Sequence, residues 1–203
     1  MTGSRPAATG TGLAGGYGTS GGYGTSGTTG GDPTDLRPGR DLTGPELAAL
    51  VAALAREDSS WRDLVRHDAG KRVYEEILHN PHLSVWLICW MDEQDTGFHD
   101  HDLSCGAVAV VAGSVREERL VLGGPPAAST FEVGKSFYFD ASAIHRVHHV
   151  GDTPAVTIHA YSPPLQRMGS YSVGPRGELV RETVPYTDEL RPQEDLHLQQ
   201  AAA

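Results

Sequence analysis

Residues 155–162 read Ala-Val-Thr-Ile-His-Ala-Tyr-Ser, and polar and apolar side chains alternate through the middle of this stretch. Successive side chains of a strand point to opposite faces. Thr157, His159 and Tyr161 therefore share one face, and Ile158 and Ala160 share the other. We expect the apolar face to pack outward against a covering element and the polar face to line the inside of a small barrel.

Further short strands are predicted on both sides of this stretch. Each is rich in β-branched, aromatic or other apolar residues and is bounded by Gly, Pro, Asn or Asp. They cover residues 72–78, 83–91, 107–122, 129–134, 136–140, 145–150 and 171–174. Their short, regular spacing predicts an all-β barrel or sandwich.

Two helices are predicted before the first strand. Thr43 and Pro45 suit a helix start, and the apolar side chains that follow form one stripe, made of Leu47, Leu50, Val51 and Leu54. A shorter helix is predicted around Trp61–Val65. The expected fold class is therefore mainly β, with a short helical cap at the N-terminal side.

The composition of the 203 residues excludes several functions. A net charge of −10 argues against nucleic acid and anionic membranes as partners. No apolar run approaches the ~18 residues of a membrane span, and the N-terminus lacks the apolar core of a secretory signal. The two cysteines, Cys89 and Cys105, cannot form a disulfide framework, which predicts a reducing, cytoplasmic location.

The chain is expected to have three parts. Residues 1–36 are rich in Gly, Ser and Thr and repeat GGYGTS at 15–20 and 21–26, which predicts a disordered tail. Residues 41–190 form the predicted folded domain, including the N-terminal helices. Residues 191–203 are predicted to be a flexible C-terminal tail.

A candidate metal site lies in Gly97-Phe98-His99-Asp100-His101. In a strand, His99 and His101 point the same way while Asp100 turns to the other face. Two neutral imidazoles side by side are natural metal ligands. The alternative is a pair of surface histidines at the end of a strand.

A third ligand is expected from the segment around residue 145. His145 follows a turn-like stretch and opens an apolar alternation, a position typical of a barrel rim. We prefer it to its rivals His148 and His149. His149 shares the face of His145 by spacing, so it is either close to the site or exposed to solvent.

The chemistry of such a site follows from its ligands. No Glu occurs in residues 102–106, and Asp102, next to His101, is expected to face away. A set of three imidazoles is neutral, so on Fe(II) it favours an anionic donor from the substrate, such as a thiolate. Zinc also binds three histidines in catalytic sites, so the residues alone do not decide which metal is bound.

The polar face of residues 155–162 is the second candidate feature. Three hydrogen-bonding side chains inside a barrel are costly unless they bind one another or a ligand. Thr157, His159 and Tyr161 are predicted to form a relay that ends with the Tyr161 hydroxyl beside the metal. The alternative is a structural network bonded to the backbone.

With these residues in view, the sequence resembles the cysteine dioxygenases, or thiol dioxygenases, of the cupin superfamily. The matching segments are LICW at 87–90, GFHDH at 97–101, IHRV at 144–147 and PAVTIHAYSPP at 154–164. Together they fall within residues 72–175. The His-Asp-His pair is common among cupins, whereas its combination with the other segments is much more specific.

The resemblance implies a cupin (double-stranded β-helix, or jelly-roll) barrel with a mononuclear Fe(II) on His99, His101 and His145. It implies oxidation of a small thiol, cysteine first of all, to its sulfinic acid with O₂. The Ser-His-Tyr relay of the family corresponds to Thr157, His159 and Tyr161. As a catalytic group, Tyr161 would stabilise oxygen or position the substrate.

The chain departs from the family pattern at Cys105. In the mammalian-type enzymes a cysteine near the second histidine cross-links to the tyrosine. Cys105 lies one residue nearer His101 than that pattern requires, and a one-residue shift turns a strand side chain to the other face. We therefore expect no thioether with Tyr161 and a small buried side chain at Cys105.

The substrate carboxylate is the second departure. The family holds it with an Arg on an early strand, or with a Gln in enzymes that use mercaptopropionate. Arg72 lies one residue from an ungapped match, and its planar guanidinium suits a carboxylate. The alternatives are an exposed Arg72 paired with Glu75 or Glu76, a carboxylate site at Arg167, and a hydrogen bond from Tyr74.

The predicted partners are a small-molecule thiol and O₂, without nucleic acid or membrane, for a monomer or weak homo-oligomer. Three alternatives remain open: a thiol dioxygenase for 3-mercaptopropionate, a cupin isomerase or lyase with zinc or manganese, and a binding module without catalysis.

Overall fold

The computed structural model describes residues 36–174 and 176–192. The predicted disordered tail, apart from Leu36, lies outside these residues, as does the predicted C-terminal tail beyond Pro192. Leu36 packs against the core, and Leu190 is buried. None of the helices in the described ranges is long and apolar enough to cross a membrane.

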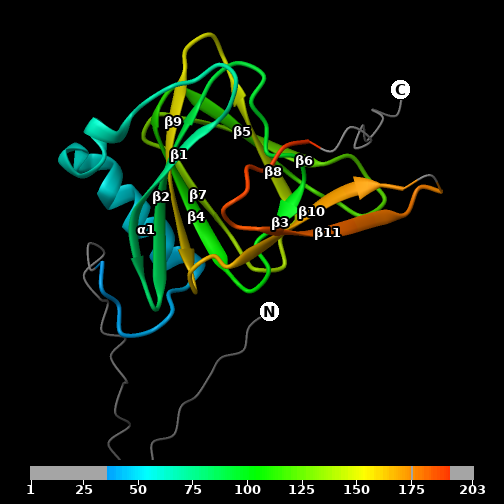
Figure 1. The fold of residues 1–203 in the computed structure, drawn as a ribbon, viewed down its shortest axis with the longest axis horizontal. Helices are drawn as coiled ribbons and strands as arrows, with labels where there is room; N and C mark the ends of the chain where they lie inside the picture. The colour runs from blue at the N-terminus through cyan, green and yellow to red at the C-terminus, as the bar shows by residue number, and fades with distance from the viewer. Residues whose placement is uncertain (1–35, 175, 193–203) are drawn as a thin grey trace, which may run out of the picture. The chain divides into compact units, whose positions relative to one another are not determined.

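The described chain contains one α-helix, two 3₁₀ helices and eleven strands (Figure 1). The helices are α1 (Gly44–Arg56), η1 (Asp58–Ser60) and η2 (Arg62–Leu64). The strands of the first half are β1 (Val73–Asn80), β2 (Leu83–Trp90), β3 (His99–Asp100), β4 (Cys105–Ala112) and β5 (Ser114–Arg119). The remaining strands are β6 (Ala127–Glu132), β7 (Ser136–Phe139), β8 (His145–Val150), β9 (Ala155–Ser162), β10 (Arg167–Val173) and β11 (Leu179–Pro185).

The strands form two antiparallel sheets, in the orders β1-β2-β9-β4-β7 and β11-β10-β3-β8-β5-β6. Many neighbouring strands are not consecutive in the chain, as the double-stranded β-helix requires, so the predicted mainly β cupin fold with a helical cap is confirmed. Figure 1 shows α1 beside the sheet that contains β2 and β4, with the β10–β11 hairpin extending from the other sheet.

Helix α1 begins close to the predicted position. The Glu46 carboxylate accepts hydrogen bonds from the backbone N–H and the hydroxyl of Thr43, both at 2.8 Å, which closes a capping box. Its apolar stripe packs against the outer face of the first sheet. In place of the second predicted helix, around Trp61–Val65, the structure has the short 3₁₀ turn η2, and η1 precedes it.

Strand β9 is buried on both faces, which explains its composition. Val156, Ile158 and Ala160 pack in the cluster that α1 covers. The other face of the strand points between the two sheets, where Ala155 and Tyr161 join the inner core. The predicted outward packing of Ile158 and Ala160 is therefore confirmed.

Besides shifted strand ends, such as that of β10, which begins at Arg167 and not at residue 171, the structure differs from the predicted strands at two places. The predicted strand 107–122 divides at Gly113, whose φ of +63° is a left-handed conformation that glycine adopts without strain, so β4 and β5 belong to different sheets. Strand β11 was not predicted, because its exposed polar residues lack the apolar alternation of a half-buried strand.

Candidate metal centre

Three histidines meet at the inner face of the second sheet. His99 lies in β3, His101 directly follows it, and His145 opens β8. His99 and His145 are direct partners in the β3–β8 register. One ring nitrogen from each of the three histidines lies within 4.8 Å of the others, and all three side chains are buried.

Hydrogen bonds fix the proton on two of these rings. His145 Nδ1 lies 2.8 Å from a Glu117 carboxylate oxygen, and His99 Nδ1 lies 3.0 Å from the Gly97 carbonyl oxygen. Both oxygens only accept, so each Nδ1 carries the proton and each Nε2 is left with a free lone pair.

The site contains buried ring nitrogens that lack a protein partner. Neither His145 Nε2 nor His101 Nδ1 has a hydrogen-bond partner within the described part of the chain. A metal ion would satisfy such orphaned nitrogens, and three neutral imidazoles are a donor set for a divalent transition metal. The residues therefore fit a metal ion.

Burial disfavours protonation of His99 and His101. It is the main reason that the pKa values of His99 and His101 lie well below the usual value, and charge on neighbouring histidines lowers them further. Because His99 and His101 hold no proton on the donor nitrogen near neutral pH, a metal would not have to displace one from these two rings.

The rival ligands lie elsewhere. His149 is buried, but its Nε2 lies 2.8 Å from the Thr153 carbonyl oxygen, in the turn after β8. His148 is on the opposite face of the strand and is partly exposed. Neither lines the cavity described below, so the structure groups His145, and not its two rivals, with the pair from residues 99–101.

The three polar residues of β9 are hydrogen-bonded in series. Thr157 Oγ1 lies 2.8 Å from His159 Nε2, and His159 Nδ1 lies 3.2 Å from the Tyr161 hydroxyl. Trp90 Nε1 donates to Thr157 Oγ1 at 2.8 Å. The Tyr161 ring stands 5.0 Å from the His101 ring between centroids, so the series ends beside the histidine cluster.

Cys105 points away from this series. In the β4–β9 register Tyr161 faces Gly106, whereas Cys105 pairs with Ser162. The Cys105 thiol lies 3.3 Å from the carbonyl oxygens of Leu42 and Ser162. This is the orientation expected from the one-residue shift, and it does not lead to a thioether with Tyr161.

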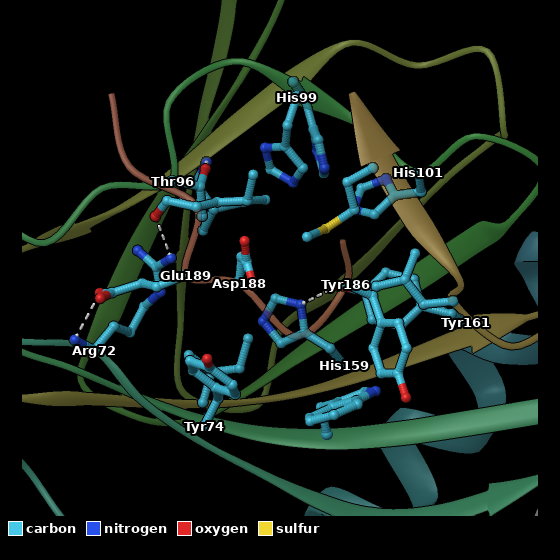
Figure 2. Close-up of a pocket in the computed structure, with 17 residues that line it drawn as sticks. Arg72, Tyr74, Thr96, His99, His101, His159, Tyr161, Tyr186, Asp188 and Glu189 are labelled. Carbon is cyan, nitrogen blue, oxygen red and sulfur yellow. Dashed lines mark hydrogen bonds between the residues drawn. The ribbon is translucent and has the colours of Figure 1, made fainter. Parts of the chain in front are cut away.

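A cavity of about 70 Å³ opens in front of the histidines. Figure 2 shows His99 and His101 on one side of it and Arg72 and Tyr74 on the other. His159 and Tyr161 also line it, so the cavity brings the candidate metal ligands and the relay together.

Arg72 lines the same cavity and is only 5% exposed. Its guanidinium donates to the carbonyl oxygens of Asp95 at 3.1 Å and Leu190 at 2.5 Å and lies over the Trp90 ring. Burial lowers the pKa of Arg72 from its usual value, and nearby acidic groups partly oppose this shift. The exposed pairing with Glu75 or Glu76 is therefore wrong.

Arg167 occupies a different place. It is exposed, and its guanidinium donates to the Asp102 carboxylate at 2.6 Å. It does not line the cavity in front of the histidines but a smaller one that His101 also lines. The structure thus brings Arg72, and not Arg167, to the histidine cluster.

A family model described as "Cysteine dioxygenase type I" matches residues 39–173 of this chain. This range includes every residue of the histidine cluster and the relay. This chain belongs to the cysteine dioxygenase type I family. The match extends from the start of the helical cap through β10.

Curated relatives are cysteine dioxygenases type 1 from vertebrates. The human protein is 24% identical over 139 residues, which cover 63% of this chain and 68% of the human one. The protein from Danio rerio is 30% identical over 132 residues, covering 60% of this chain and 66% of that protein. Among solved structures, TT1209 from Thermus thermophilus has a TM-score of 0.45 and 18% identity, covering 50% of this chain and 92% of that chain.

Two parts of this cysteine dioxygenase-family site were missed in the sequence. The first is Glu117, which is 4% exposed and contacts His145. The only signal for it in the sequence is its spacing in a strand, which puts Glu117 on the same face as Val115 and Arg119. The second is the segment after β11, which contributes Tyr186, Asp188, Glu189 and Leu190 to the cavity wall. No local pattern marks that segment, because its contacts are with residues 72 and 74, more than a hundred residues earlier.

Proposed function

We propose that this protein is an iron-dependent thiol dioxygenase that oxidises a small thiol, cysteine in the first place, to its sulfinic acid. The thiol gains both atoms of O₂, so RSH and O₂ give RSO₂H without another reductant. The observation that carries the proposal is the buried group of three histidine nitrogens within 4.8 Å, in one cavity with His159 and Tyr161 of the β9 relay. Membership of the cysteine dioxygenase type I family supports it.

His99, His101 and His145 would hold the metal. Fe(II), when bound, supplies the one-electron redox chemistry that allows ground-state O₂ to react with a thiolate. Three imidazole ligands bring no negative charge, so the cavity favours the anionic form of the thiol. Burial favours the neutral form of His99 and His101 by lowering their pKa values.

The relay would present a proton to the cavity. Thr157 has one hydroxyl proton, and its short contact is with His159 Nε2 at 2.8 Å, while the Ile88 carbonyl oxygen is 3.5 Å away. If Thr157 donates to Nε2, His159 carries its proton on Nδ1 and donates to the Tyr161 oxygen. The Tyr161 hydroxyl proton is then free to bind oxygen or substrate.

Tyr161 keeps that proton at physiological pH. Burial raises the pKa of its hydroxyl above the usual value, and the charge of Arg72 opposes this shift only in part. Tyr161 is therefore a hydrogen-bond donor in this proposal and not a phenolate. Thr157 and His159 act through it by orienting its hydroxyl.

Arg72 is the group we propose for the substrate carboxylate. It is the only Arg or Lys among the described residues that line the cavity. The guanidinium has more N–H donors than its two backbone bonds use, so donors remain for a carboxylate. Arg167 is the less favoured candidate for the carboxylate, because it lines the smaller cavity and not the one in front of the histidines.

The test is oxygen uptake by the iron-loaded full chain with cysteine, cysteamine, 3-mercaptopropionate and mercaptosuccinate. We expect uptake with at least one thiol and, with isotope-labelled O₂, both labels in the sulfinic acid. Tyr161→Phe should lower kcat, while the exposed Tyr138→Phe should not. Full iron occupancy without uptake for any thiol would contradict the proposal. The free thiols of Cys89 and Cys105 fit the cytoplasmic location that we propose with it.

A further inference from the structure

One wall of the cavity consists of three aromatic rings. Trp86 lies between Tyr74 and Tyr186, with ring centroids 6.2 and 6.1 Å apart. The interplanar angles of 57° and 69° show that the rings are tilted and not stacked on one another's faces. All three rings line the cavity that contains the histidine cluster.

A carboxylate stands beside these rings. Asp188 follows Tyr186 in the segment after β11 and lines the same cavity, as Figure 2 shows near the centre of the view. Its carboxylate has no ion pair with any described residue and receives one long hydrogen bond, 3.4 Å from the Thr187 hydroxyl. Its negative charge is therefore available to a ligand.

The other charged groups of this wall have partners. Glu189 accepts from the Arg191 guanidinium at 2.7 Å and from the Arg72 backbone N–H at 2.9 Å. The Arg72 guanidinium donates to two carbonyl oxygens and lies over Trp90. Asp188 is thus the charge of the wall with the fewest protein partners.

Contacts with β1 and the residue before it hold the wall in place. The Tyr74 hydroxyl donates to the Thr187 carbonyl oxygen at 2.9 Å, and Arg72 binds the backbone of Leu190. The segment with Tyr186 and Asp188 lies beyond residue 173, where the family match ends. This part of the pocket is therefore supplied by residues outside the matched region.

Aromatic faces next to a carboxylate attract organic cations. A cation within about 6 Å of a ring centroid interacts with the negative face of the ring, and Trp is the strongest partner. A nearby carboxylate adds direct charge attraction. A neutral or anionic group would gain neither interaction.

We propose that Tyr74, Trp86, Tyr186 and Asp188 form a subsite for an ammonium or quaternary ammonium group at the end of the substrate away from its sulfur. The inference rests on the proposed function in placing the sulfur at the histidine cluster. The substrate class it names is a small thiol that carries a cationic nitrogen.

The first experiment measures binding without turnover. Choline and its neutral isostere 3,3-dimethylbutan-1-ol are titrated calorimetrically into the full chain. We expect choline to bind about tenfold more tightly, as a cation–π contact with a carboxylate partner would give. Equal affinities for the two compounds, or no choline binding, would overturn the proposal.

Variants locate the binding. Asp188→Asn and Tyr186→Leu should each weaken choline binding several-fold, whereas Asp152→Asn, which changes an exposed acid in the turn after β8, should not. A choline affinity that is unchanged in both wall variants would place the cation elsewhere and overturn the proposal.

A kinetic experiment connects the subsite to turnover. In the iron-loaded protein, Asp188→Asn should lower the ratio of kcat/KM for thiocholine to that for 3-mercaptopropionate. An unchanged ratio would overturn the assignment of the substrate class. If no thiol is oxidised but choline binding depends on Asp188, the proposed function fails while the cation subsite is supported.

Discussion

At the residue scale, the contact between Glu117 and His145 changes the electrostatics of the histidine cluster. A carboxylate that is 4% exposed lies against the His145 ring and also accepts from Arg119 at 3.0 Å. A carboxylate on the far nitrogen of a metal-binding imidazole orients the ring and makes it a stronger donor. We therefore assign Glu117 a positioning role.

Glu117→Gln tests that role. The amide can still contact Nδ1, but it lacks the negative charge, so we expect the dissociation constant for divalent metal to rise about 10–100-fold. Metal titration of the purified chain measures it. Glu132→Gln, an exposed substitution on β6, is the matched control, and equal affinities of the two variants would show that Glu117 has no influence on the metal.

His159 provides a pH-dependent prediction. Burial, followed by the charges of His145 and Arg72, lowers its pKa to about 3 from the usual 6.5. Between these values the unfolded chain binds a proton that the folded chain does not, so stability falls as the pH falls through this window. The slope from one such group reaches about 1.4 kcal/mol per pH unit.

His159→Gln should therefore flatten the pH dependence of unfolding. His99 and His101 have pKa values shifted in the same direction, so the slope should decrease without vanishing. The measurement is the free energy of unfolding by denaturant between pH 4 and pH 6, a window inside about 3 to 6.5. His79→Gln, which replaces an exposed imidazole, is the control, and an identical slope in wild type and His159→Gln would refute the assignment.

At the element scale, the β10–β11 hairpin fixes the segment His99–His101, which contains the first two histidines. Asp100 lies between them in β3, and its side chain turns away from the cavity. Arg181 of β11 donates to both of its carboxylate oxygens, at 2.6 and 2.8 Å, and the Tyr171 hydroxyl donates at 2.6 Å. Burial opposes the charge of Asp100, but these bonds outweigh it and hold the pKa of Asp100 below its usual value.

Arg181→Met should loosen this connection. Asp100 would lose two charge-assisted hydrogen bonds, and we expect a loss of about 1–3 kcal/mol in the free energy of unfolding, toward the lower end because Arg181 is partly exposed to water. Arg176→Met, in the exposed turn of the same hairpin, should have little effect. A weaker metal affinity is expected for Arg181→Met alone, and equal behaviour of the two variants would contradict the role of the hairpin.

At the scale of the whole molecule, stability and the site depend on different cores. The cluster under α1 contains Leu47, Leu50 and the outward residues of β9, whereas the cluster between the sheets contains Tyr161 and its neighbours. The strands β2, β4 and β9 of the first sheet contribute residues to both clusters. A defect under α1 should therefore lower stability without changing the metal centre.

Leu50→Ala tests this separation. Leu50 is 1% exposed, so truncation should leave a cavity and cost about 2–5 kcal/mol in the free energy of unfolding. Leu122→Ala, at a side chain that is 91% exposed, should change it by less than about 0.5 kcal/mol. We expect both variants to keep the metal affinity of the wild type, and a tenfold loss in Leu50→Ala would show that the cap supports the site directly.

Local pattern was enough for much of this protein. The alternation in residues 155–162 predicted which side chains of β9 face inward, because a strand has a fixed period of two. The same period grouped His99 with His101 and turned Cys105 away from Tyr161. The resemblance to the cysteine dioxygenases predicted the cupin barrel. This prediction depended on the whole set of matching segments, because the His-Asp-His pair alone is common among cupins.

The tertiary structure decided what depends on distant pairing. The β3–β8 register set His145 directly opposite His99, and the β5 strand brought the charge of Glu117 to it. The segment after β11 became a wall of the cavity through Tyr74 of β1 and Arg72 just before that strand. A sequence determines the face of each side chain locally, but contacts between remote segments arise only when the sheets close and bury them together.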